Sequence, residues 1–158
     1  MHIKRNFDYK IGIISDTHGL IRQPIVQLFA DVDLIIHAGD IGNPMVLETL
    51  QTIAKVYAVR GNVDVGELAA NLPKTDLVKV GEFFFYVLHD INELNLDPAA
   101  AGLHGVISGH SHRAKIEKRD GVLFLNPGSA GPKRFQLPAT LAFIYVKGVT
   151  LDAEVIEI

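Results

Sequence analysis

Three short apolar segments rich in β-branched residues dominate the first sixty residues, and segments with helical periodicity separate them. The apolar segments cover residues 10–15, 34–38 and 56–59, and such nearly continuous hydrophobicity is typical of strands buried on both faces. Residues 23–30 and 43–53 lie between them, and each of these segments has a proline near its predicted first turn. This strand–helix–strand–helix–strand order predicts a parallel sheet with helices packed on it.

The second predicted helix has a recognisable start. Asn43 and Pro44 form an N-cap and first-turn pair. The residues expected on its buried face are Met45, Val46, Leu50 and Ile53.

The second half of the chain contains strands joined by tight turns. Hairpins are predicted about Gly81-Glu82, Asp120-Gly121 and Lys147-Gly148, and they join residues 77–80 to 83–88, 115–119 to 122–125, and 140–146 to 149–156. Residues 106–108 predict a further strand, and Asp97-Pro98 predicts the start of a short helix. With 158 residues and no repeat or linker, we expect one domain over residues 1–158, with a mixed sheet or a two-sheet α/β sandwich.

The absence of cysteine excludes several kinds of site. A chain without cysteine has no disulfide, thiol nucleophile, cysteine-ligated zinc or iron–sulfur cluster. A metal would have to be bound by His, Asp, Glu, Asn or backbone oxygen. The formal net charge of −3 argues against nucleic acid as a partner, because non-specific binding needs a basic surface.

The sequence predicts neither a membrane span nor an export signal. The longest stretch without Asp, Glu, Lys or Arg is residues 98–112, and three glycines and three histidines interrupt it. Residues 1–8 lack the apolar region of a signal peptide. We therefore expect a cytoplasmic protein, and the sequence leaves its homo-oligomeric state open.

Side chains with metal-binding chemistry follow five of the predicted strands. In chain order they are Asp16, His18, Asp40, Asn62, His89, His110 and His112. Ligands of open α/β sheets bind outside the carboxyl ends of strands. One Asp or Asn there is most often a turn former, and one His is most often hydrogen-bonded or at the surface. Five strand ends with the same chemistry predict a metal site.

These residues occur in blocks that resemble, in type and order, those of the calcineurin-like metallophosphoesterases. The blocks are Asp16-Thr17-His18, Gly39-Asp40, Gly61-Asn62, His89 and Gly109-His110-Ser111-His112, and Asn126-Pro127-Gly128-Ser129 resembles the small bacterial and archaeal phosphodiesterase branch. Together they extend over residues 16–129 and are far more specific than any single block. The resemblance implies a four-layer αββα sandwich, in which helices flank two mixed β-sheets.

The resemblance also implies a catalytic site with two divalent metal ions. Asp16, His18 and His112 would bind one ion, Asn62, His89 and His110 would bind the other, and Asp40 would bridge both. Nitrogen and oxygen ligands without sulfur suit Mn²⁺, Fe or Zn²⁺, and Ni²⁺ is also compatible. Of these ions we expect Mn²⁺.

The implied activity is hydrolysis of a small phosphate ester, most simply a diester, by attack of a metal-bridging hydroxide. Two divalent ions, two carboxylates and one hydroxide leave a net charge of about +1 facing the phosphate. Asn62, Arg113, Ser129 and Arg134 are candidate substrate contacts. The alternatives are a phosphomonoesterase or nucleotidase, and a non-catalytic protein-binding scaffold similar to the retromer's phosphoesterase-like subunit.

Two positions depart from the family pattern. Many relatives have a histidine directly after the position of Asn62, which is proposed to protonate the leaving group, whereas this chain has Val63. The small phosphodiesterase branch also lacks that histidine. Asp90 stands where relatives often have glycine, and it is either a carboxylate behind the ligands or a turn former. His37 matches no ligand position, so we expect it to be buried and hydrogen-bonded.

Overall fold

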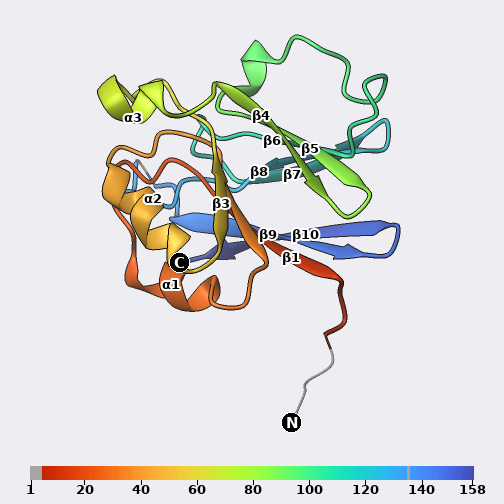
Figure 1. The fold of residues 1–158 in the computed structure, drawn as a ribbon, viewed down its shortest axis with the longest axis horizontal. Coiled ribbons are helices and arrows are strands. Elements are labelled where there is room, and N and C mark those ends of the chain that lie inside the picture. Colours follow the sequence, from red (N-terminus) through yellow and green to blue (C-terminus); the bar gives the residue numbers. More distant parts are fainter. Residues whose placement is uncertain (1–4, 135) are drawn as a thin grey trace.

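The chain forms two five-stranded sheets, as a computed structural model that describes residues 5–134 and 136–158 shows (Figure 1). The first sheet has the order β10-β9-β1-β2-β3. Its strands are β1 (Tyr9–Ile14), β2 (Leu34–His37), β3 (Lys55–Ala58), β9 (Thr140–Lys147) and β10 (Thr150–Glu157). β1, β2 and β3 run parallel, whereas β9 is antiparallel to β1 and β10. The predicted parallel arrangement of the first three strands is confirmed.

The second sheet has the order β4-β5-β6-β8-β7. Its strands are β4 (Thr75–Val80), β5 (Phe83–Leu88), β6 (Gly105–Ile107), β7 (Lys115–Arg119) and β8 (Val122–Asn126). β5, β6 and β8 run parallel, and the edge strands β4 and β7 are antiparallel to their neighbours. Asp120 and Gly121 have φ values of 52° and 78°, so the turn between β7 and β8 has positive φ at both central residues, as a type I′ hairpin requires. The predicted hairpins are confirmed.

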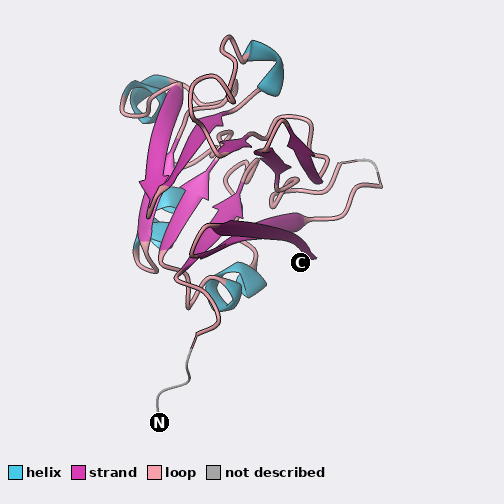
Figure 2. Cartoon of the chain, turned by 90° about the vertical axis from the view of Figure 1, so that its right-hand side faces the viewer, coloured by secondary structure: helices cyan, strands magenta, loops and turns pink. Residues whose placement is uncertain are grey.

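Helices lie outside the strands (Figure 2). α1 (Gln23–Leu28) and α2 (Pro44–Gln51) pack on the first sheet, α3 (Gly66–Ala70) follows β3, and the 3₁₀ helix η1 (Ile91–Glu93) packs outside the second sheet. The predicted two-sheet α/β sandwich is therefore confirmed, with an outer layer over the second sheet that consists of η1 and the segment after it. No described helix is long and apolar enough to span a membrane.

The largest hydrophobic core lies between the two sheets. Its most buried strand residues, each at most 1% exposed, are Ile11, Ile13, Ile36, Ala142 and Ile144 of the first sheet and Val78, Phe85, Val87, Ile107 and Leu125 of the second. Full burial of a large aliphatic or aromatic side chain contributes about 1.5–3 kcal/mol. This core holds the two sheets, and hence the loops at their ends, in one arrangement.

α2 begins as predicted but has a narrower apolar face. The Asn43 side chain accepts a hydrogen bond of 2.9 Å from the backbone N–H of Met45, and Pro44 is the first helical residue. Val46 and Leu50 are buried, whereas Met45 is 58% exposed. The predicted burial of Met45 is wrong, because residues 46 and 50 define the buried face and residue 45 is turned about 100° from residue 46.

Two further local features differ from the sequence-based expectation. Asp97-Pro98 begins a single turn rather than a helix. The Asp97 carboxylate accepts hydrogen bonds from the N–H groups of Ala99 and Ala100, as a helix N-cap does. Gly102, with a φ of 77°, follows before a helix can extend. No sequence pattern predicts α3, since its five residues bury no side chain and Val65 provides no side-chain cap.

We expect Phe29→Ala to destabilise the protein strongly and Met45→Ala to have little effect. Phe29 is fully buried, its ring lies 5.7 Å from that of Phe143, and it fills space that a Cβ at Gly12 would occupy. The free energy of unfolding should fall by about 3–5 kcal/mol for Phe29→Ala and by less than about 0.5 kcal/mol for Met45→Ala, as measured by urea denaturation. Equal effects would contradict the packing of α1 on the first sheet.

Candidate metal centre

All seven candidate ligands lie at one end of the sandwich, where parallel strands of both sheets end. They are Asp16 and His18 after β1, Asp40 after β2, Asn62 after β3, His89 after β5, and His110 and His112 after β6. Their side chains form two groups of three His and Asp residues, with Asn62 beside the second group. Both sheets contribute to the site, so its geometry depends on how the sheets pack.

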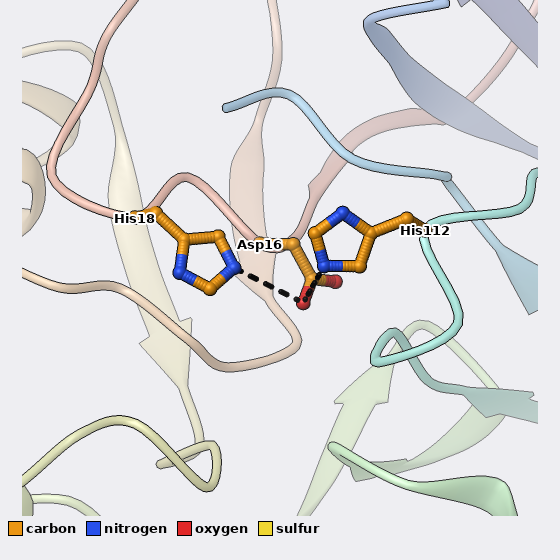
Figure 3. Close-up of side chains that lie close together, drawn as sticks. All are labelled: Asp16, His18 and His112. Atoms are coloured by element: carbon orange, nitrogen blue, oxygen red, sulfur yellow. Dashed lines mark ion pairs between the residues drawn. The ribbon is translucent and has the colours of Figure 1, made fainter. Parts of the chain in front are cut away.

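Asp16, His18 and His112 form the first group (Figure 3). Nε2 of His18 lies 3.8 Å and Nε2 of His112 lies 3.4 Å from the same oxygen, Oδ1 of Asp16. The second oxygen, Oδ2, accepts hydrogen bonds from the Ser15 hydroxyl at 2.7 Å and from the backbone N–H of His110 at 3.0 Å. These bonds leave Oδ1 facing the two imidazoles.

Asp40, His89 and His110 form the second group. Nε2 of His89 lies 3.2 Å from Oδ2 of Asp40, and Nδ1 of His110 lies 3.3 Å from Nε2 of His89 and 3.2 Å from Oδ1 of Asn62. On the opposite side of its ring, Nδ1 of His89 donates a 2.8 Å hydrogen bond to the carbonyl of Ala38. Such a bond fixes the ring orientation and tautomer of a metal-binding histidine.

Asp40 lies between the two groups. Its Oδ2 is 3.7 Å from Nε2 of His18 and 3.2 Å from Nε2 of His89. Its Oδ1 accepts a 3.0 Å hydrogen bond from the backbone N–H of Val63. One carboxylate oxygen therefore faces imidazoles of both groups and is placed to be shared by two cations.

The donor atoms do not all satisfy one another by hydrogen bonds, and their arrangement suits a bound cation. Among the described residues, the buried atoms Oδ1 of Asp16 and Nε2 of His18 have no hydrogen-bond partner, although an unsatisfied buried polar atom costs about 1–3 kcal/mol. The ligand atoms of each group lie within 4.8 Å of one another. A divalent cation would satisfy them, and nitrogen and oxygen donors without sulfur suit Mn²⁺, Fe or Zn²⁺.

The backbone of the site adopts a conformation that is uncommon for residues other than glycine. Five candidate ligands have φ values between 46° and 70°, namely Asp16, His18, Asp40, His110 and His112. In the described part of the chain, the one other non-glycine residue with positive φ is Asp120 of the β7–β8 turn. Each such residue costs about 1–3 kcal/mol and persists only where its surroundings enforce the conformation, and such residues cluster at functional sites.

The charged groups of the site alter one another's protonation. Burial raises the pKa of Asp16. Burial acts in the same direction on Asp40, but hydrogen bonds from His89 and from the N–H of Val63 outweigh it and lower the pKa of Asp40 to about 2. Burial lowers the pKa of His89, but the hydrogen bond with Asp40 and that with the Ala38 carbonyl reverse the balance and raise it. A metal ion at Nε2 of His89 would require the unprotonated nitrogen, so metal binding there would compete with protonation.

His37 joins the loops after β1 and β2. Its Nδ1 accepts a 3.1 Å hydrogen bond from the N–H of Gly39, so Nε2 carries the proton and donates to the Thr17 hydroxyl at 3.0 Å. That hydroxyl donates to the carbonyl of Ile41 at 2.9 Å. His37 is fully buried, so the prediction of a buried, hydrogen-bonded histidine is confirmed.

Asp64 is a supporting residue that sequence reasoning missed. Its carboxylate accepts hydrogen bonds from the N–H groups of Ile41, Gly42 and Gly61 at 3.2, 2.9 and 2.8 Å. It therefore connects the loop after β2 to the loop after β3. The available signal was a second acidic residue two positions after Asn62, but an Asp near glycine is usually a turn former, and only the fold shows which loop it reaches.

Asn126 and Ser129 support the site from within the protein. Nδ2 of Asn126 donates to the carbonyl of Gly109 and to the hydroxyl of Ser111. The Ser129 hydroxyl donates to the carbonyl of Asp16 at 3.0 Å, and the residue is only 5% exposed. Ser129 was expected to contact substrate, but this bond commits its hydroxyl to the loop after β1 and burial hides it from a ligand.

Arg113 and Arg134 remain candidates for contact with an anionic ligand. Both are exposed; Arg113 follows His112 directly, and Arg134 is close enough to His112 for its charge to act on that ring. Burial lowers the pKa of His112, and the charge of Arg134 adds to this effect. Both guanidinium groups are therefore accessible to a negatively charged ligand.

Residues 9–148 match the family model of the calcineurin-like phosphoesterase superfamily domain. The chain belongs to this superfamily. A probable metallophosphoesterase of Methanothermobacter thermautotrophicus is 34% identical over an alignment of 159 positions, which covers 93% of this chain and 91% of that protein. A phosphodiesterase of Methanocaldococcus jannaschii is 30% identical, with 75% of this chain and 82% of that protein covered. The family resemblance seen in the sequence is confirmed, and the protein is a metal-dependent phosphoesterase by family.

Solved structures of two different kinds share the fold. Vps29 of Chaetomium thermophilum superposes with a TM-score of 0.78 at 18% identity, covering 96% of this chain and 97% of Vps29. A predicted phosphoesterase of Streptococcus pneumoniae superposes with a TM-score of 0.73 at 22% identity, covering 94% and 89%. At these identities the likeness establishes the fold alone.

We expect His37→Gln to reduce the loss of stability at acid pH. Burial lowers the pKa of His37 to about 3, so between that value and about 6.5 the unfolded chain binds a proton that the folded protein excludes. Stability from this group is complete above about pH 6.5 and falls by about 1.4 kcal/mol per pH unit below it. Between about pH 7 and pH 5, the metal-free wild type should lose about 2 kcal/mol more free energy of unfolding than the variant. Equal losses in urea denaturation would contradict a neutral His37.

Proposed function

We propose that the protein is a dinuclear, Mn²⁺-dependent phosphodiesterase that hydrolyses a small phosphate ester. The observation that carries this proposal is the position of Asp40 between two groups of nitrogen and oxygen donors. In the proposed site, Asp16, His18 and His112 bind one ion, Asn62, His89 and His110 bind the other, and Asp40 bridges them.

The residues of the chain have distinct roles in this proposal. Two divalent ions, when bound, supply an activated water near neutral pH and positive charge for the phosphate. Asp40 would hold the two halves of the site together, and Asn62 would contact a phosphate oxygen as well as an ion. Arg113 and Arg134 add positive charge at the exposed side of the site. No side-chain nucleophile is required, which agrees with a chain that lacks cysteine.

The likeness to Vps29 makes a protein-binding scaffold the main alternative. All seven ligand positions hold suitable donors, and buried donor atoms among the described residues lack partners, which supports a functional metal site. Metal analysis after incubation with Mn²⁺ and gel filtration should find about two ions per chain. Hydrolysis of bis(p-nitrophenyl) phosphate should be faster than that of p-nitrophenyl phosphate. A metal-free, inactive protein would support the scaffold, and faster monoester hydrolysis would support a phosphomonoesterase.

We expect Asp40→Asn to remove most of the activity and to lower the metal content. The change keeps the side-chain volume but removes the charge that both groups share. The loss of diester hydrolysis should exceed the roughly 10–100-fold typical of residues that only support metal ligands. Asp152→Asn on β10 is the matched control and should behave as wild type. Normal metal content and turnover in Asp40→Asn, with unchanged circular dichroism, would refute the two-metal proposal.

We expect Val63→His to accelerate esters with poor leaving groups selectively. The backbone N–H of Val63 contacts Asp40 and its side chain is 41% exposed, so an imidazole there has access to solvent beside the site. A positioned general acid contributes about 10²–10⁴-fold, and alkoxide leaving groups need it more than nitrophenolate does. Turnover should be measured against leaving-group pKa for both proteins. A wild type that shows no dependence would already contain an acid elsewhere.

A further inference from the structure

A hollow of about 250 Å³ adjoins the second group of candidate ligands. One part of its wall is the site itself, through Asn62, His89 and His110. The remainder carries four charged side chains, which are Arg60, Lys74, Asp90 and Glu93. This position allows an ester whose phosphate lies at the proposed metal centre to place an organic arm in the hollow.

The charged side chains around the hollow contact one another, a candidate ligand and the backbone. Nζ of Lys74 lies 3.5 Å from Oε2 of Glu93, and Oδ2 of Asp90 lies 3.8 Å from Nε2 of His110. The guanidinium of Arg60 donates a 3.1 Å hydrogen bond to the backbone carbonyl of Leu72. Two cations and two carboxylates face the same space, so their formal charges cancel.

This lining selects against most kinds of organic arm. A second anionic group would be attracted by Arg60 and Lys74 but repelled by Asp90 and Glu93, and a cationic group would meet the reverse, so a net charge on the arm gains little from a lining whose formal charges cancel. An alkyl arm would displace water from the charged groups without replacing its hydrogen bonds, which is unfavourable. Hydroxyl groups both donate to carboxylates and accept from Lys and Arg, so a neutral arm with several hydroxyls satisfies both kinds of partner.

We propose that this hollow binds the alcohol arm of the phosphate ester and that this arm is a neutral polyhydroxylated group of glycerol to monosaccharide size. The inference rests on the proposed function, which places the phosphate beside the hollow. The size limit follows from the volume, which is below the roughly 300–1,000 Å³ of pockets for drug-sized ligands.

A second hollow serves as a contrast. It has a volume of about 600 Å³, lies over β7 and β8, and is lined in part by Phe124, Leu137 and Pro138. It contains none of the candidate ligands. Four charged side chains also line it, namely Arg113, Lys115, Glu117 and Arg119. Its apolar side chains would suit an alkyl or aromatic arm, which the first hollow lacks the lining to receive, so the chemistry of the preferred arm distinguishes the two hollows.

The test compares two phosphate monoesters that carry the same charge. Glycerol 3-phosphate and propyl phosphate have the same carbon chain, and only the former has two hydroxyls. Calorimetric titration of the Mn²⁺-loaded protein should show about ten-fold tighter binding of glycerol 3-phosphate. Lys74→Met and Glu93→Gln should each reduce this ratio to about three-fold or less. The matched controls, Lys118→Met and Glu82→Gln, should preserve it.

The ratio of the two affinities separates hydroxyl recognition from general electrostatics. Lys74→Met lowers and Glu93→Gln raises the positive potential at the site, so these changes alter the affinity for propyl phosphate in opposite directions. Both variants nevertheless remove a hydrogen-bonding charge and should lower the ratio. Equal affinity for the two esters in the wild type, or a ratio that both variants leave unchanged, overturns the inference while diester hydrolysis leaves the proposed function standing. Failure to bind either ester in a protein that hydrolyses diesters overturns the inference alone, whereas failure to bind Mn²⁺ overturns both.

Discussion

The contact between Asp40 and His89 joins the two sheets where the candidate site forms. Asp40 follows β2 of the first sheet, His89 follows β5 of the second, and their Oδ2 and Nε2 atoms are 3.2 Å apart. The same oxygen reaches His18 at 3.7 Å, so one carboxylate connects both groups of donors. This contact requires that the sheets pack in one register, and the apolar core between them enforces that packing. The core therefore contributes to function as well as stability, because a shift of one sheet relative to the other would separate the two groups.

The loops that carry the ligands are strained, and buried hydrogen bonds hold them in place. Five candidate ligands have positive φ, while His37 and Asp64 connect the loops through backbone groups. The backbone at Gly109 also approaches the loop after β1 closely, since a Cβ there would overlap the side chains of Ser15 and Asp16. Such a network pre-orders the donor atoms, so a bound cation does not have to organise flexible loops.

The fold alone does not determine the activity of this protein, which depends on particular residues. Vps29 and phosphoesterases share this sandwich, and one fold can support unrelated functions. In this chain the donor positions are complete, and the adjoining hollow carries charges of both signs. The proposed activity depends on the first feature and the proposed choice of substrate on the second. The proposed metal binding and the proposed choice of substrate depend on different side chains, because the charged residues of the hollow are not candidate ligands. Relatives with the same donor residues can therefore differ in substrate.

Patterns in the sequence were sufficient to predict the order of the first strands and helices, the hairpin turns and the candidate ligands. Alternating strands and helices, the Asp120-Gly121 turn and the order of the ligand blocks were all readable from the residues, because each reflects chemistry within a few positions of the chain. The exposure of Met45, the burial of Ser129, the part played by Asp64 and the charged hollow beside His110 were not readable in this way. Each depends on which distant backbone or side chain lies opposite, and the hydrophobic packing of two sheets against one another decides that. The sequence by itself determined which donor atoms exist and, through the family resemblance, the expected place of Asp40. Only the tertiary structure decided the distances at which Asp40 lies between the two groups, because they depend on how the two sheets pack.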